Sequence, residues 1–132
     1  MGTCTTFCDP EFWPSWERIS ALHSEIDVAV GWHPKKTSQG KKKERLAQLD
    51  RLLDHPRVVA LGEIGLDQTI GFKDWARQNE VLLDILRLAR GHQVIVFHAR
   101  GMKEDVDSEA VLLLLRCLAG RALSRGRGRG IK

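Results

Sequence analysis

The segment from Val58 to Asp67 limits the possible folds of this chain more than any other. It reads Val-Val-Ala-Leu-Gly-Glu-Ile-Gly-Leu-Asp. The four small or branched apolar residues at its start predict a short strand over 58–62 that is buried on both faces, as in a parallel sheet. Two glycines then flank Glu63, so we expect the chain to turn there, at the carboxyl end of the strand. Parallel α/β folds bind ligands at that end, which makes Glu63 a candidate functional residue. The alternative is that Glu63 is a solvated loop residue and that Asp67 caps a helix.

Short apolar runs alternate with amphipathic segments along the chain. One apolar run and the amphipathic segment that follows it together span roughly 25–35 residues, which is typical of parallel strands joined by helical crossovers. A run of six apolar residues over 110–115 predicts a last helix that is covered on two sides. The pattern therefore predicts an α/β fold. We expect strands over 2–8, 26–32, 58–62 and 94–97, and helices over 15–25, 44–54, 74–90 and 108–119.

Two histidines occupy positions equivalent to that of Glu63. His98 follows the next predicted strand, and His33 follows the preceding one. Because the carboxyl ends of neighbouring parallel strands meet at one rim, these side chains should lie together. One carboxylate and two imidazoles are typical of a metal-ion site. The remaining three histidines fall on predicted helix surfaces or turns, where solvation or capping is the simpler role.

Composition restricts the class of protein further. Three cysteines without a C-x-x-C pair favour a reducing, intracellular setting, either nucleus or cytoplasm. No apolar run approaches the ~20 residues that a membrane span needs. The formal charge of +4 comes from residues 121–132, which hold five basic residues and no acidic one. We therefore expect a near-neutral domain over 1–120 and a disordered Arg/Gly-rich tail over 121–132.

Four sequence blocks, in the same order and at similar spacing, resemble the TatD-type metal-dependent deoxyribonucleases. The block Gly-Glu-Ile-Gly-Leu-Asp is the most specific of them, and the Cys4 to Trp16 segment looks closest to vertebrate TatD-domain-containing deoxyribonucleases. The resemblance covers roughly residues 1–120 and is carried by 31–34, 62–67, 77–78 with 86–89, and 94–100.

The resemblance implies a TIM-type (β/α)8 barrel that hydrolyses phosphodiester bonds, chiefly in DNA, with RNA as the alternative substrate. It implies one or two divalent cations, Mg²⁺ first and Mn²⁺ or Zn²⁺ as alternatives. By the same resemblance, Glu63 would be the carboxylate shared between two metals and His98 a ligand to one of them. His33 and Arg100 would contact the substrate phosphate.

The chain also departs from this family. It contains no H-x-H pair, which would supply two ligands, and Lys35 stands where the second histidine of G-x-H-P-H would be. We therefore expect an internal piece of such a nuclease, a partial barrel of about four βα units. Its activity as this chain should be weak or absent, and open sheet edges could drive self-association. The alternative is a non-catalytic nucleic-acid or protein interaction fragment that uses the Arg/Gly tail.

Overall fold

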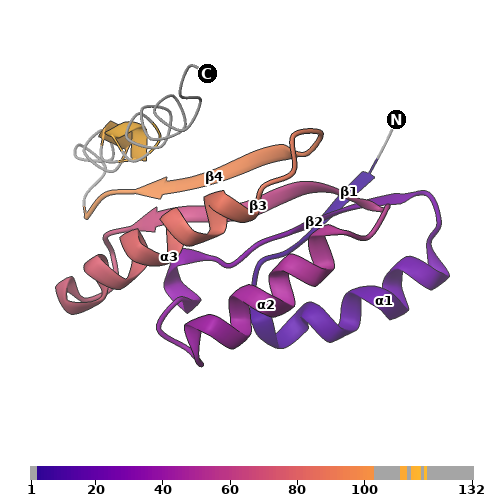
Figure 1. The fold of residues 1–132 in the computed structure, drawn as a ribbon, viewed down its shortest axis with the longest axis horizontal. Coiled ribbons are helices and arrows are strands. Elements are labelled where there is room, and N and C mark those ends of the chain that lie inside the picture. Colours follow the sequence, from indigo (N-terminus) through magenta and orange to yellow (C-terminus); the bar gives the residue numbers. More distant parts are fainter. Residues whose placement is uncertain (1–2, 103–110, 113, 117, 119–132) are drawn as a thin grey trace, which may run out of the picture.

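The computed structural model describes residues 3–102, 111–112, 114–116 and 118. Four parallel strands form one sheet in the order β1-β2-β3-β4, so strands that follow one another in sequence are neighbours in space (Figure 1). The predicted strands are thus present, and their pairing is parallel throughout. Their bounds are β1 Thr3–Phe7, β2 Ile26–Val30, β3 Val58–Asp67 and β4 Val94–Arg100.

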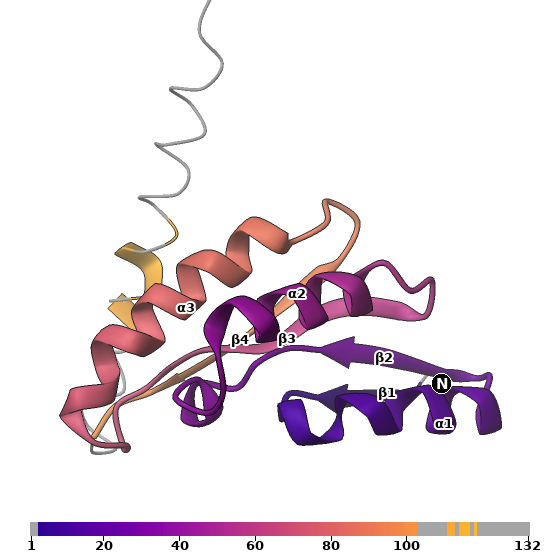
Figure 2. The same cartoon turned by 60° about the horizontal axis from the view of Figure 1, so that its bottom comes forward.

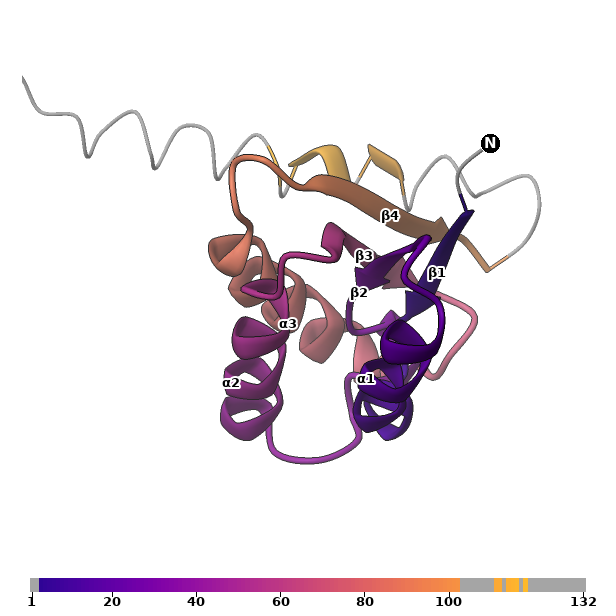
Figure 3. The same cartoon turned by 90° about the vertical axis from the view of Figure 1, so that its right-hand side faces the viewer.

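Three helices connect the strands and lie together on one side of the sheet (Figure 3). Figure 2 shows α2 and α3 running alongside one another, and ion pairs join them, among them Lys42 Nζ to Asp84 Oδ2 at 2.8 Å. Short 3-10 turns precede α1 and α3 and follow β2. The bounds are α1 Trp13–Leu22, α2 Lys42–Leu53 and α3 Trp75–Leu88, with turns η1 Pro10–Phe12, η2 Pro34–Lys36 and η3 Phe72–Asp74.

The first helix begins before the predicted cap at Ser15. Asp9 instead accepts a hydrogen bond from the Glu11 amide and starts η1, which leads directly into α1. The indole N–H of Trp13 donates to the carbonyls of Phe7 at 3.2 Å and Gly31 at 3.1 Å. The helix therefore starts where its first side chain can bridge the ends of β1 and β2.

The core lies between the sheet and the helices. One face of α3 is buried, as expected of an amphipathic helix, and the helix packs against β3. Each buried large apolar side chain contributes roughly 1.5–3 kcal/mol to folding. The largest fully buried apolar residues are Trp16, Trp32, Leu49, Leu53, Leu61, Ile64, Leu82, Ile85 and Leu86.

The predicted end of the central strand at 62 is wrong, because β3 continues to Asp67. Leu61 pairs with Ile95 of β4, but Ile64 pairs with Phe97, so three steps along β3 match two steps along β4. The extra residue is a β-bulge at Gly62–Glu63, a feature that redirects side chains and often lies beside active sites. Glu63 is consequently not in a turn after the strand, as predicted, but on the bulge within it.

Beyond the bulge the backbones of β3 and β4 approach closely. Gly65 pairs with His98 and has a φ of 150°, a conformation that disfavours residues with a side chain. A Cβ built on Gly65 would lie 1.9 Å from the His98 carbonyl oxygen. A glycine is therefore required here for the strand pairing that sets His98 beside β3.

The C-terminal predictions are only partly described. Residues 111–112, 114–116 and 118 are helical, in agreement with the predicted last helix. Leu114 is buried whereas Val111, Leu112 and Leu115 are exposed, so cover is present on one side of this segment. The predicted tail over 121–132 lies outside the described residues. Within the described ranges, no helix is both long enough and apolar enough to cross a membrane.

Replacing Gly65 by alanine is expected to lower the free energy of unfolding by at least about 1–3 kcal/mol, the cost of a strained backbone position. Gly91→Ala is the matched control, because nothing lies within 4 Å of a Cβ at that position. The control should change stability by no more than ~0.5 kcal/mol. Urea unfolding followed by circular dichroism measures both variants, and equal midpoints would contradict the close approach of β3 and β4.

Candidate metal centre

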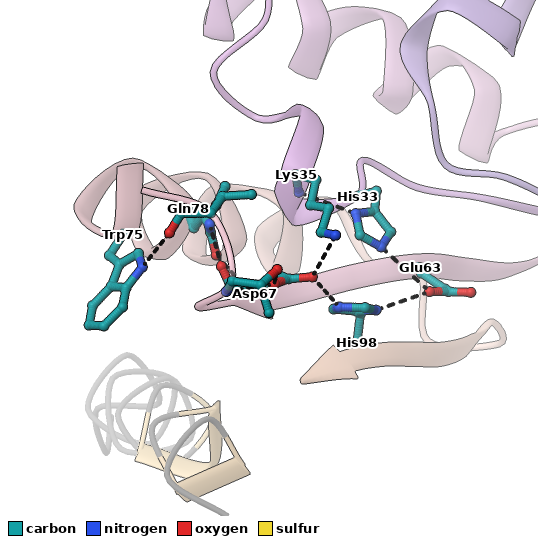
Figure 4. Close-up of polar contacts among 9 residues, drawn as sticks. His33, Lys35, Glu63, Asp67, Trp75, Gln78 and His98 are labelled. Atoms are coloured by element: carbon teal, nitrogen blue, oxygen red, sulfur yellow. Dashed lines mark hydrogen bonds and ion pairs between the residues drawn. The ribbon is translucent and has the colours of Figure 1, made fainter. Parts of the chain in front are cut away.

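Three side chains predicted to share a rim do come together. His33 follows β2, Glu63 lies on the bulge of β3, and His98 lies in β4 (Figure 4). Glu63 Oε2 is 3.4 Å from His98 Nδ1 and 3.9 Å from His33 Nε2. One donor atom from each residue lies within 4.8 Å of the others, a spacing that could hold a metal ion. The prediction that the side chains of Glu63 and His98 lie together on adjacent strands is thus confirmed.

The backbone fixes His33 at the end of β2. Its N–H donates to the Cys8 carbonyl at 2.8 Å, which extends the β1–β2 pairing past the strand ends. Its ring Nδ1 accepts the Lys35 amide N–H at 3.2 Å. With Nδ1 in use as an acceptor, the neutral ring carries its proton on Nε2, the atom that faces Glu63. His33 is therefore arranged as a hydrogen-bond donor toward the site.

Burial lowers the pKa of the His33 imidazole, and the neighbouring charge of His98 lowers it further. The nearby carboxylates of Glu63 and Asp67 act in the opposite direction without reversing the shift. His33 is consequently neutral at pH 7.

A fourth residue, Asp67, was missed by the sequence reasoning, which offered it only as a helix cap. That alternative does not hold, because Asp67 ends β3 and its side chain is 0% exposed. Its Oδ2 lies 2.9 Å from His98 Nε2 and 3.9 Å from Lys35 Nζ. Once β3 is known to continue, the two-residue period of a strand places Glu63, Gly65 and Asp67 on one face, and this signal could have found it.

The pKa of the Asp67 carboxyl lies below its ordinary value although burial acts to raise it. Hydrogen bonds donated by the Thr69 hydroxyl and amide, the bond from His98, and the charge of Lys35 together outweigh desolvation. Asp67 is therefore a buried carboxylate that stays ionised at neutral pH.

Gln78 of α3 holds the Asp67 peptide from both sides. The Asp67 N–H donates to Gln78 Oε1 at 2.7 Å, and Gln78 Nε2 donates to the Asp67 carbonyl at 2.9 Å. The neighbouring Arg77 donates to the Thr37 carbonyl at 3.1 Å, which connects α3 to the loop that follows His33. Gln78 thus anchors the end of β3, and Arg77 anchors the loop after β2.

The other predicted residues lie as follows. Arg100 pairs with Asp67 in the strand register and is exposed, so it lies at the same end of the sheet, and its contact with phosphate stays a prediction. His23 lies 3.6 Å from Glu25 at the surface, and His55 accepts the Arg57 amide in a turn. Neither belongs to the cluster, as expected, and His92 is exposed outside it.

The lowered pKa of His33 gives a testable pH dependence in metal-free protein. The unfolded chain has the ordinary imidazole value of about 6.5 and takes up the proton first. The free energy of unfolding should therefore fall as the pH decreases from about 6.5 through the folded pKa. His33→Gln lacks this titration. When the pH is lowered from about 8 to about 5, the free energy of unfolding should therefore fall further for wild type than for the variant. Chemical denaturation with EDTA measures it, and a constant difference would contradict the shift.

Gln78→Leu should destabilise the chain because it leaves the buried amide and carbonyl of Asp67 without partners. The expected loss in the free energy of unfolding is at least about 1–3 kcal/mol. Gln48→Leu is the control, since Gln48 is exposed and only accepts a bond from Arg45 at 3.2 Å. Denaturant unfolding measures both variants. Equal losses in the free energy of unfolding would refute the stabilising role of the two hydrogen bonds between Gln78 and the Asp67 backbone.

Comparison with known proteins identifies the family of this chain. The TatD related DNase family model matches residues 2–111. An uncharacterized metal-dependent hydrolase, YabD of Bacillus subtilis, is 32% identical over 120 residues, which are 83% of this chain and 47% of YabD. The crystal structure of YJJV, a TatD homolog from Escherichia coli K12, has a TM-score of 0.68 at 24% identity and shares the fold over 88% of this chain and 44% of that one. This chain spans about half the length of these relatives, its fold is that of part of the TIM-type barrel predicted from the sequence, and it belongs to the TatD related DNase family.

Proposed function

We propose that this chain carries a divalent-cation site of a phosphodiesterase that acts on DNA. The single observation that supports it most is the 3.4 Å approach of Glu63 Oε2 to His98 Nδ1 at the carboxyl ends of two adjacent parallel strands. Parallel barrels place their chemistry at that rim. Membership of the family and the similarity to a metal-dependent hydrolase support the same assignment.

The residues present fit a divalent cation. Glu63 and His98 are the proposed ligands, because a carboxylate oxygen and an imidazole nitrogen suit Mn²⁺ and Zn²⁺, whereas Mg²⁺ prefers oxygen ligands. The Mg²⁺ predicted from the resemblance therefore stays a prediction, to be tested against Mn²⁺. The half-exposed carboxylate of Glu63 has two oxygens, which allows it to serve two cations in a complete barrel.

A bound cation would supply a Lewis acid that activates water and offsets the charge developing on the phosphate. The residues around it prepare the substrate. His33 turns its Nε2–H toward the site and would donate to a phosphate oxygen. Lys35 and Arg100 place positive charge near the same rim and would attract the nucleic-acid backbone.

We expect this chain by itself to bind the cation weakly and to hydrolyse DNA slowly. The described residues bring three donor side chains together, and one of them, His33, is arranged to donate a proton rather than to ligate. Tight sites for these ions need several fixed ligands.

Glu63→Gln should weaken Mn²⁺ binding by more than about tenfold, since loss of a ligand costs at least as much as loss of a partner that only orients one. It should also abolish slow cleavage of a single-stranded DNA oligonucleotide, with an RNA oligonucleotide as the second substrate. Glu44→Gln is the matched control, because Glu44 is exposed on α2 and lies 3.8 Å from Lys41. Isothermal titration and gel-resolved hydrolysis provide the two measurements.

Equal Mn²⁺ binding and equal cleavage by wild type and Glu63→Gln would refute the proposed site.

Deleting 121–132 tests the alternative function in the same assays. If the tail is the nucleic-acid binder, deletion should remove DNA affinity and flatten its dependence on salt, by ~0.7 in log–log slope for each phosphate that the tail had neutralised. Unchanged binding after the deletion would leave the rim of the sheet as the binding surface.

We also propose that copies of the chain associate through open sheet edges. Within the described residues β1 and β4 each pair with one strand, and Val94 and Val96 of β4 are exposed. Such an edge is a template for pairing with another chain. Sedimentation velocity across a range of concentrations, run beside the binding assays, would show whether the species tested is a monomer.

A further inference from the structure

The carboxylate of Asp67 contacts the His98 ring at the nitrogen that faces away from Glu63. Its side chain is 0% exposed, and its Oδ2 contacts His98 Nε2 at 2.9 Å (Figure 4). We propose that Asp67 holds His98 with its proton on Nε2, so that the Nδ1 lone pair faces Glu63 and the cation site. This inference rests on the proposed function only for what Nδ1 would bind.

The tautomer follows from donor and acceptor chemistry. An ionised carboxylate accepts hydrogen bonds and cannot donate them, so the imidazole nitrogen beside it must carry the proton. A neutral imidazole has one N–H, which leaves Nδ1 with a lone pair. That lone pair lies 3.4 Å from Glu63 Oε2, another acceptor. Two acceptors facing one another are favourable when a cation lies between them, which agrees with ligation through Nδ1.

The surroundings prevent the Asp67 carboxylate from turning away. Its Oδ1 accepts two hydrogen bonds from Thr69, one from the amide at 2.9 Å and one from the hydroxyl. Its backbone is clamped by Gln78 on both sides. Oδ2 is thereby reserved for His98 and for the more distant Lys35. A group locked in this way orients the ring before any ligand arrives.

The two histidines of the site are consequently set by different partners. The Lys35 amide N–H occupies Nδ1 of His33 and leaves a proton on Nε2. Asp67 occupies Nε2 of His98 and leaves a lone pair on Nδ1. Of the two rings, His98 is the one prepared as a ligand, although both lie near Glu63 and their centroids are 4.4 Å apart.

Asp67→Asn is the decisive variant because it keeps the shape of the side chain and changes its donors. Asparagine has one acceptor oxygen, and the two Thr69 donors would draw it toward themselves. Its NH₂ group would then face His98 Nε2 and force that atom to accept. The proton would move to Nδ1, between the ring and Glu63. Exchange of aspartate for asparagine beside a catalytic histidine is known to give the wrong tautomer in serine proteases.

The experiment uses the 132-residue chain labelled with ¹⁵N-histidine, metal-free, at about pH 9, where an ordinary imidazole is neutral. Long-range ¹H–¹⁵N correlation spectra report which nitrogen of each ring carries the proton. Wild-type His98 should be protonated on Nε2, and Asp67→Asn should move that proton to Nδ1 while His33 keeps its own tautomer. Asp84→Asn is the control: Asp84 lies in α3, pairs with Lys42 at 2.8 Å, and should leave the His98 spectrum unchanged.

Mn²⁺ titration is the second readout. Asp67→Asn should bind Mn²⁺ about 10- to 100-fold more weakly, the usual effect of losing a partner that orients a ligand. Lost charge alone could lower affinity as well, but it would not move a proton within the ring. A weaker affinity with the Nε2–H tautomer retained would therefore overturn the positioning role.

The wild-type spectrum decides the case if Asp67→Asn does not fold. A proton on Nδ1 of wild-type His98 at about pH 9 would refute the inference, whatever the variants do. Wild-type protein that shows the Nε2–H tautomer but takes up no Mn²⁺ would contradict the proposed function and support the positioning role of Asp67. The two claims can therefore fail separately.

Discussion

The pairing of β3 with β4 beyond the bulge at Gly62–Glu63 is the constraint on which the candidate site depends. The bulge shifts the register by one residue, so that Gly65 rather than a larger residue lies opposite His98. Close approach of the two backbones then sets the His98 ring between Glu63 on one side and Asp67 on the other. Without the extra residue, His98 would pair with Ile64, and its side chain would lie on the opposite face of the sheet from Glu63 and Asp67.

A buried carboxylate is costly unless donors compensate it, and the contacts of Asp67 show how the fold meets that cost. Thr69, Gln78 and His98 each satisfy a different atom of the residue. Because these partners come from the loop after β3, from α3 and from β4, the site and the packing of the last strand–helix–strand unit stabilise one another. Loss of the unit would remove together the proposed ligand His98 and the Asp67 carboxylate that contacts it.

Much of the fold was predictable because buried strands and amphipathic helices leave clear apolar patterns, which identified all four strands and their order. The strand ends were not predictable from these patterns. The apolar run stops at Gly62, and glycine and acidic residues have low strand propensity, so the continuation of β3 to Asp67 looked like a turn. In a parallel barrel, however, the residues at the carboxyl ends of strands face a functional rim and need not be apolar. Taking the end of the apolar run as the end of the strand located Glu63 and His98 at the rim. The same assumption left the residues after Glu63 out of the predicted strand.

The same limitation explains which parts of the site were found. Residue type and spacing brought Glu63, His98 and His33 to one rim, since these depend only on the repeat of strand and helix. The difference between the two histidines depends on which nitrogen already has a partner, and the partners are a backbone amide and a carboxylate two positions beyond Gly65. No pattern of residue types contains that information. In the proposed site, the role of each imidazole follows from its hydrogen bond on the side away from Glu63. The distance from Glu63 alone does not distinguish a ligand from a proton donor.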